Sequence, residues 1–483
     1  MTRATLTRTA LYGGGAVAAV IACLVALAAG SIIGVPVMIA VALGAVVLTV
    51  ILLLPTDWLP SAALVVFLVV PRVALNVSDL TSTVSPALLV LVLWYVKSWA
   101  DVRRARETGT APERVGAWPK VIVAVLLLWI LLLLVYRGPR LTSLAWTFAF
   151  VVLCLVILFV PHATRAIRNL QSTFLWSAAV MAVYCTLEYI AGSNLIFERV
   201  NALVSTEPLQ HWSVYRAYGS LGHPLYAGLF FAMAFAIAFG RRFSGGGNRN
   251  LVFAALSMLG VVLTVSRSSV GAVAIAAAVI VVPSLVRRSS LSPALRAFLA
   301  VLVVGGVFAI TQAGAFQDRL GSTEAQGSTD ARNAVFDLSV ITAQAYDWLG
   351  AGPAMALTAA APFNPNAVII ESAYLQILIS LGIPGLVLIG LLVAAGALRA
   401  MRAGAYAGLG ALAAFCTAAA FFNILESSRP SLILLGFALL MAWREDPALT
   451  PLPERAAAFG PERNAVQAAR TPAAAGARGP RAR

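Results

Sequence analysis

Charged residues are scarce in this sequence: Asp, Glu, Lys and Arg make up 11% of its 483 residues, whereas hydrophobic residues make up 60%. A typical soluble domain carries about 25% charged residues, and no long polar block here could fold as a separate soluble domain. The composition therefore excludes an ordinary soluble protein and predicts an all-α polytopic membrane protein. We divide it into an integral membrane domain, residues 1–443, and a tail, residues 444–483.

Cysteine and histidine are also scarce, with four and three copies. The cysteines all lie in apolar runs, and their spacing matches neither a metal site nor a disulfide framework. The sequence lacks a phosphate-binding glycine loop followed by lysine, a dinucleotide fingerprint and a nucleophile elbow. We therefore expect no metal and no cofactor. The net charge of +15 comes from basic residues scattered singly among loops, which argues against a nucleic-acid partner.

Long apolar runs make up most of the chain. Segments of roughly 16 to 24 residues recur, about the length of a helix that crosses ~30 Å of hydrocarbon. We predict about 14 transmembrane helices, near residues 10–29, 33–54, 59–75, 84–100, 119–136, 141–161, 172–192, 224–239, 251–266, 268–286, 295–312, 373–396, 404–422 and 430–443.

One apolar run is too long for a single span. Residues 251–286 would form a helix of about 54 Å, so the run must break into two spans. We place the break at residues 266–268, within the sequence "TVSRSSVGA". Arg267 would then lie at the tip of a hairpin between the two spans.

The basic residues set the orientation. With the N-terminus in the cytoplasm, most Lys and Arg fall in inside segments, as the positive-inside rule requires. No cleavage pattern stands out after the first apolar run, so we expect a retained helix there. We therefore predict a plasma-membrane protein with both termini cytoplasmic and a disordered basic tail. The weak span 59–75 contains Pro71 and Arg72 and could be re-entrant, which would redraw the topology before residue 84.

Two long loops are expected outside, at residues 193–224 and 313–372. The second carries apolar residues at three- and four-residue spacing, which predicts an amphipathic helix on the outer surface. Its apolar positions are Val335, Leu338, Ile341, Ala345 and Trp348. Ser328, Thr329 or Asp330 would start this helix.

The charged residues near the spans all fall toward the predicted outer ends: Arg72, Glu188, Arg216, Arg267, Glu371, Glu426 and Arg429. This distribution favours a site at the outer surface, because an ion-coupled transporter typically keeps acidic groups near the bilayer midplane. Two outer guanidinium groups, Arg216 and Arg267, could bind a diphosphate through charge-assisted hydrogen bonds. The alternative is that each anchors the protein to lipid headgroups. Arg332, on the second loop, could join the pair.

Two further residues are candidates for handling a proton or positioning substrate. His223 precedes Pro224 and a span, and it could act as a base or start the helix; we favour a structural or substrate-positioning role. Glu371 and Ser372 precede another span. They could cap that helix, or Glu371 could accept a proton from an incoming sugar hydroxyl.

The order of these parts resembles the O-antigen ligase and polymerase superfamily. The stretches that carry the resemblance are "YRAYGSLGHPLYAG", "LTVSRSSVGA", "DARNAVF" with "YDWLGAGP", and "ESAYLQILISLGIPGLVLIGLL", which cover about residues 200–395. The resemblance implies a membrane glycosyltransferase that uses polyprenyl-diphosphate-linked saccharides, with a glycan or lipid-linked acceptor and membrane lipids as its partners.

The resemblance also implies roles for individual residues. Outer-face arginines, here Arg216 and Arg267, would hold the donor diphosphate, while Arg332 on the large loop would help the acceptor hydroxyl attack. Ligases of this family usually have a His-Asn pair where this sequence has Glu371 and Ser372, and this departure favours a polymerase or another glycan transferase. The alternative functions are a transporter or flippase for lipid-linked glycans and a scaffold for other envelope enzymes.

Overall fold

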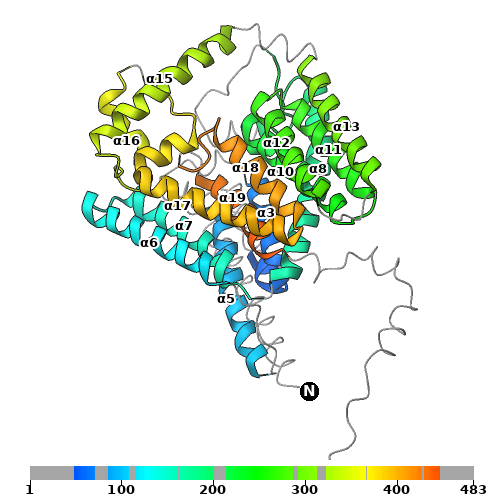
Figure 1. Ribbon diagram of the computed structural model, residues 1–483, viewed down its shortest axis with the longest axis horizontal. Coiled ribbons are helices and arrows are strands. Elements are labelled where there is room, and N and C mark those ends of the chain that lie inside the picture. Colours follow the sequence, from blue (N-terminus) through cyan, green and yellow to red (C-terminus); the bar gives the residue numbers. More distant parts are fainter. Residues whose placement is uncertain are drawn as a thin grey trace, which may run out of the picture.

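The computed structural model describes residues 48–70, 85–107, 116–161, 163–198, 214–286, 292–312, 323–365, 367–426 and 429–445. Every regular element in these ranges is a helix (Figure 1). The longer helices are α3 Leu59–Val69, α5 Pro86–Glu107, α6 Ala117–Arg137, α7 Leu141–Phe159, α8 Ala163–Ala191, α10 Pro224–Phe243, α11 Arg249–Leu263, α12 Arg267–Val286, α13 Pro293–Gln312, α15 Thr323–Ala345, α17 Ala373–Ala403, α18 Tyr406–Ala419 and α19 Leu432–Arg444. The short ones are η1 Thr56–Trp58, η3 Gly219–Leu221, α16 Ala356–Ala360, η4 Ala361–Phe363 and η5 Arg429–Ser431.

The all-helical membrane architecture is confirmed. Five helices are long and apolar enough to cross a membrane, namely Ala117–Arg137, Ala163–Ala191, Pro224–Phe243, Arg267–Leu285 and Ala373–Ala403. Shorter apolar helices occupy most of the other predicted positions, including α11, α18 and α19. The total of about 14 crossings remains a prediction. The span at residues 10–29, most of that at 33–54 and the tail beyond residue 445 lie outside the described residues.

Helix α3 is shorter than its predicted span, residues 59–75. It has 11 residues and ends at Val69, so it rises only about 17 Å. Val70 adopts an extended conformation, with φ −77° and ψ 115°. The cause is Pro71, whose ring disfavours a helical conformation in the residue before it.

The long apolar run breaks two residues earlier than residues 266–268. Helix α11 ends at Leu263 and α12 begins at Arg267, so the turn is Thr264 to Ser266. Val265 lies in the left-handed region with φ 46°, which is strained for a β-branched side chain. Arg267 is therefore the first residue of α12.

Helix α15 differs from the predicted amphipathic helix at its start and in its buried face. It begins at Thr323, upstream of residues 328–330. Val335 and Leu338 are buried as expected, but Ile341 is 50% exposed and Ala345 is exposed. The buried face continues instead through Ser339 and Thr342. Their hydroxyls donate to carbonyls one turn back, at 2.7 Å each, which satisfies these polar groups in the interior.

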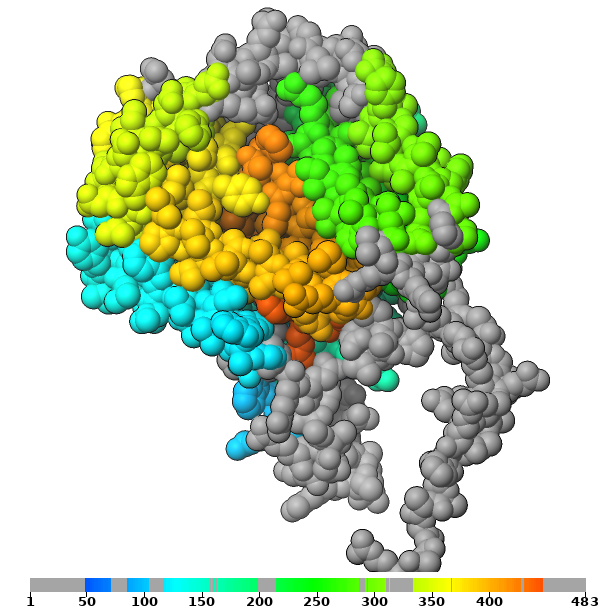
Figure 2. All heavy atoms as spheres, viewed as in Figure 1, coloured from blue at the N-terminus to red at the C-terminus, as the bar shows by residue number. Residues whose placement is uncertain are grey.

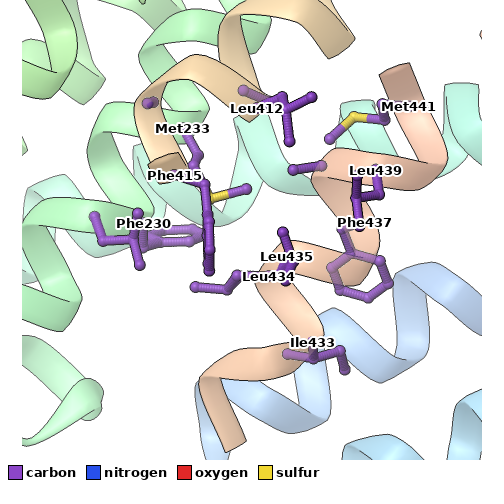
Figure 3. Packing of buried hydrophobic residues seen from close by; sticks show 14 of the residues in the cluster. Phe230, Met233, Leu412, Phe415, Ile433, Leu434, Leu435, Phe437, Leu439 and Met441 are labelled. Carbon is purple, nitrogen blue, oxygen red and sulfur yellow. The ribbon is translucent and has the colours of Figure 1, made fainter. Parts of the chain in front are cut away.

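The packing core surrounds α10, which lies between α11, α12 and α18 (Figure 1). Within its apolar stretch, 94% of the residues are buried, which identifies α10 as the central helix of the bundle. Phe230 and Met233 of α10 face Phe415 of α18, and α19 packs beside them with Leu434 and Phe437 (Figure 3). Because neighbouring helices surround α10, we use its two ends to name the two ends of the bundle. We call them the Arg216 end, at Pro224, and the Arg241 end, at Phe243.

Candidate active site

A buried carboxylate organises the Arg216 end. Glu188, near the end of α8, is 0% exposed. Its Oε1 accepts hydrogen bonds from Tyr215 Oη and Tyr218 N, each at 3.0 Å, and its Oε2 accepts one from Gly219 N at 2.9 Å. Asn194 Nδ2 donates to the Gly219 carbonyl at 2.9 Å. These bonds fix the segment from Tyr215 to Gly219 against α8.

Burial and the neighbouring Glu188 carboxylate both affect Tyr215 and Tyr218. Together they raise the pKa of each phenol well above its ordinary value. Both tyrosines therefore stay protonated at physiological pH, and the Tyr215 hydroxyl remains a donor to Glu188.

The same segment carries Arg216 to the end of α11. Arg216 is 5% exposed, and its Nε donates to the Thr264 carbonyl at 3.0 Å. Ala217 N donates to the Leu263 carbonyl at 3.0 Å. The carboxyl end of a helix carries partial negative charge, so a guanidinium group is well placed there. The arginine segment is thus attached directly to the Thr264–Ser266 turn that precedes Arg267.

Serine side chains start α12 beside this contact. Ser266 Oγ accepts a hydrogen bond from Ser269 N at 3.3 Å and another from Ser269 Oγ at 2.8 Å, which is the arrangement of an N-cap. Arg267, the first residue of the helix, is exposed. The helix N-terminus carries partial positive charge and free backbone N–H groups. Arg267 therefore adds its own charge to a region that already attracts anions.

Close packing of α10 and α12 brings their first turns together. A Cβ atom added at Gly228 would lie 2.0 Å from Ser269 Oγ and 3.3 Å from Thr264 Oγ1. Only glycine permits this approach. The N-terminus of α10 therefore lies beside the turn that carries Arg267.

His223 caps α10 and links it to the end of α18. Its Nδ1 accepts a hydrogen bond from Leu225 N at 3.2 Å. Its ring stacks on Phe422 with centroids 5.6 Å apart and an interplanar angle of 20°. The Phe422 carbonyl in turn accepts a hydrogen bond from Ala373 N, at 3.2 Å, at the start of α17. His223 therefore serves as a helix start, one of the two roles considered for it.

Glu371 lies two residues before that junction. Its side chain is exposed, whereas the preceding Ile370 is fully buried. Ser372 occupies the N-cap position of α17, but its side chain makes no capping hydrogen bond. The backbone thus holds an exposed carboxylate at the same end of the bundle as Arg216 and Arg267.

The loop after α15 closes over a break in α17. Gly382 has φ 70° and ψ −175°, so α17 is interrupted there. Ala351 N and Gly352 N donate to the carbonyls of Ile379 and Ser380, at 2.8 and 2.9 Å. Two further donors come from α6: Trp129 Nε1 binds the Leu381 carbonyl at 2.8 Å, and Arg137 Nε binds the Gly350 carbonyl at 2.9 Å. The backbone groups released by the break are thus satisfied within the protein.

A second buried carboxylate supports this loop. Glu426 is 4% exposed, and its Oε2 accepts hydrogen bonds from Ser380 Oγ at 2.8 Å and from Ala356 N at 3.4 Å. Glu426 therefore ties the segment after α18 to the broken part of α17 and to α16. Glu426, noted in the sequence as a charge near a span end, therefore holds these segments together.

Figure 2 shows that the surface is hollowed between the yellow-green region of α15 and α16 and the green region of α12, with orange residues from the region of α18 at the floor.

Arg332 lies on α15, but its side chain is outside the described residues. The same holds for Arg429, and Arg72 is outside the described ranges altogether. The structure therefore brings together the segments of Arg216, His223, Arg267 and Glu371, and it leaves Arg332 without a described contact.

A family comparison covers the second half of this site. Residues 252–390 match the family model described as O-antigen ligase. The match confirms the resemblance found in the sequence, and it extends from α11 into α17, past the break at Gly382. It includes Arg267, Arg332 and Glu371, whereas Arg216 and His223 precede it. A search of curated proteins found no match to the chain.

Sequence reasoning missed the residues that hold the O-antigen ligase-like region in place. Glu188 and Glu426 were noted only as charges near span ends, and Ser380 and Arg137 were not considered. A carboxylate beside a long apolar stretch was the available signal, because such a group, once buried, needs several donors to be stable. Which donors it finds depends on tertiary contacts that no spacing rule predicts.

Proposed function

We propose that the protein is a membrane glycosyltransferase that transfers or polymerises polyprenyl-diphosphate-linked saccharides at the outer face of the cytoplasmic membrane. The observation that carries the proposal is the attachment of the Arg216 segment to the turn before Arg267, with Arg216 Nε 3.0 Å from the Thr264 carbonyl. The O-antigen ligase family match over residues 252–390 supports the same chemistry.

In the proposed reaction, an acceptor hydroxyl oxygen attacks the anomeric carbon of the donor sugar. The bond from that carbon to the diphosphate oxygen breaks, and polyprenyl diphosphate leaves with the bonding electrons. The charge that develops on the leaving group needs positive groups placed in advance. Arg267 and the N-terminus of α12 supply them, while Arg216 holds the turn and adds a second positive charge. Arg332 on α15 would approach from the loop side.

The proton of the acceptor hydroxyl needs a base. Glu371 is the proposed acceptor of this proton, because its carboxylate is exposed at the same end of the bundle and makes no hydrogen bond to the described part of the chain. His223 is assigned to positioning of the substrate, since its Nδ1 already accepts a hydrogen bond from Leu225 N.

The local charge favours binding of an anionic donor. The sequence has no Asp or Glu from Pro208 to Gln317, the stretch that holds Arg216 and Arg267.

The first test replaces Arg267 in purified protein supplied with a lipid-linked oligosaccharide. Arg267→Ala should slow transfer by about 100-fold or more, the usual effect of removing a group that stabilises developing charge. Arg267→Lys should recover part of the rate. Arg402→Ala is the matched control, because Arg402 is an exposed arginine in the last turn of α17. Equal rates in Arg267→Ala and the wild type would remove Arg267 from the mechanism.

The product also distinguishes the possible activities. A ladder of lengths identifies a polymerase, and a single addition identifies a ligase. Movement of the lipid-linked glycan across vesicles without any new glycosidic bond would instead support the flippase alternative.

The second test replaces Glu371. We expect Glu371→Gln to reduce the turnover number by about 100-fold and to change donor binding much less, because the carboxylate acts on the acceptor. Donor affinity and turnover should be measured separately on the same preparation. An unchanged turnover number would leave Glu371 as a residue that only stabilises the start of α17.

A further inference from the structure

The Arg241 end of the bundle contains a cavity that the proposed reaction does not use. Its volume is about 130 Å³, and it lies between α8, α10 and α11. On this measure one water needs about 10–15 Å³, so the cavity can hold a larger group. Helix α10 has 20 residues and rises about 30 Å. The cavity is therefore separated from the candidate active site by the length of this helix.

Polar and basic residues line the cavity. Arg241, at the end of α10, is 6% exposed, and its guanidinium donates to Ser172 Oγ at 3.3 Å. Arg249 and Asn250, which begin α11, also line it. Asn250 is 1% exposed, and its Nδ2 donates to the Gly247 carbonyl at 3.0 Å. Its Oδ1 has no hydrogen-bond partner among the described residues. A buried acceptor without a donor indicates a ligand that can donate.

The charge of the cavity fits one phosphodiester. Arg241 and Arg249 contribute two positive charges, and Glu445 lies close enough to Arg241 for an electrostatic interaction. Glu445 also accepts a hydrogen bond from Gly408 N at 3.1 Å, so it belongs to the adjoining contact with α18. Glu445 also interacts electrostatically with Arg399, so the two arginines keep the cavity lining positively charged and suited to a phosphodiester group.

Exposed apolar residues adjoin the cavity. Trp176, in the cavity wall, is 65% exposed, and its ring meets Phe253 edge-on with centroids 5.1 Å apart. Exposed apolar residues continue from Trp176 along α8 at Val180, 67% exposed, and from Phe253 along α11 at Leu259, 40% exposed. Tryptophan is enriched at the headgroup level of membranes. A lipid could therefore lay its chains on this face and turn its headgroup into the cavity.

We propose that this cavity binds the headgroup of an anionic glycerophospholipid from the leaflet opposite the candidate active site. The phosphate would contact Arg249 and Arg241, and a headgroup hydroxyl would donate to Asn250 Oδ1. Basic pockets between membrane helices bind anionic headgroups in this way. Phosphatidylglycerol, which has one phosphodiester charge and two hydroxyls, has the required chemistry. The bound lipid would connect α8 to α10 and α11 and so stabilise the bundle from its second end.

The test measures lipid binding to the purified full chain by native mass spectrometry. Phosphatidylglycerol and phosphatidylcholine are titrated separately into the detergent-solubilised protein. Arg249→Gln should weaken phosphatidylglycerol binding by about tenfold or more, as expected from the loss of hydrogen bonds from a charged group. Ser172→Leu fills the cavity but leaves both arginines in place, and it should have a similar effect.

Arg402→Gln is the control for the loss of one positive charge at this end. The neighbouring Gly404 carbonyl accepts a hydrogen bond from Ser244 Oγ at 3.2 Å, which places Arg402 near the end of α10. This variant should bind phosphatidylglycerol as the wild type does. Equal wild-type affinity for the two lipids, or unchanged phosphatidylglycerol binding in both cavity variants, would overturn the proposal. Displacement of the lipid by millimolar inorganic phosphate would overturn it as well, because the cavity would then be a site for free anions.

Discussion

Replacement of Glu188 tests how the Arg216 end is held. Glu188→Ala removes the acceptor for two buried backbone N–H groups, Tyr218 N at 3.0 Å and Gly219 N at 2.9 Å. It also removes the acceptor for Tyr215 Oη. Each unsatisfied buried donor costs about 1–3 kcal/mol, so the two backbone groups alone should cost about 2–6 kcal/mol. The segment that places Arg216 would then lose its attachment to α8.

Two measurements on the same purified variant check this expectation. The thermal midpoint in detergent should fall, with wild type and variant heated at the same rate because unfolding of such proteins is commonly irreversible. Transfer of a lipid-linked saccharide should slow by about 100-fold, since a shift of about 1 Å in a positioned group has an effect of that size. The loss of rate should persist well below the unfolding temperature.

Glu198→Ala is the matched control. Glu198 lies just beyond α8, near enough to raise the pKa of Tyr215, but it accepts no hydrogen bond from the described part of residues 214–219. It should change neither the midpoint nor the rate by much. If Glu188→Ala kept the wild-type midpoint and rate, the carboxylate would not be what positions Arg216.

Two glycines give further predictions. Gly228→Ala should lower stability by about 1–3 kcal/mol and reduce the transfer rate, because the new Cβ would lie 2.0 Å from Ser269 Oγ. The double variant with Ser269→Gly should regain part of the stability and part of the rate, measured by thermal unfolding and transfer assays. Gly382→Ala should unfold at a clearly lower temperature, since its φ of 70° and ψ of −175° are open essentially to glycine only; Gly390→Ala, with open space around it, should not.

Much of the helical pattern could be predicted from hydrophobicity alone. The described apolar helices from α5 onward overlap the predicted spans, because long apolar runs have no stable alternative to a helix in a membrane. Three of them, α5, α8 and α17, extend seven to nine residues beyond the predicted ends. Boundaries were less reliable. The turn after α11 lies two residues earlier than predicted because Arg216 and Ala217 pair with the carbonyls at its end, a contact between distant parts of the chain.

The site could be predicted in part. Arg216, Arg267 and Glu371 could be selected because charges are rare near membrane spans and tend to be functional there. His223 is a helix cap because its Nδ1 accepts a hydrogen bond from Leu225 N. The His-Pro sequence permits this local contact but does not require it. The hydrogen bonds of Glu188 and Glu426 could not be predicted, since their donors come from other segments. The buried face of α15 was partly wrong because Ser339 and Thr342 satisfy their hydroxyls within the helix.

The break at Gly382 has a consequence for how this protein tolerates changes in length. In an unbroken helix, one inserted residue rotates everything beyond it by about 100°. Here the part of α17 before Gly382 is held by Ala351 N and Gly352 N, so its rotation is set locally and not by the rest of the helix. The segment after Gly382 can therefore be lengthened or shortened, for example to suit a thicker or thinner bilayer, while Glu371 keeps its orientation.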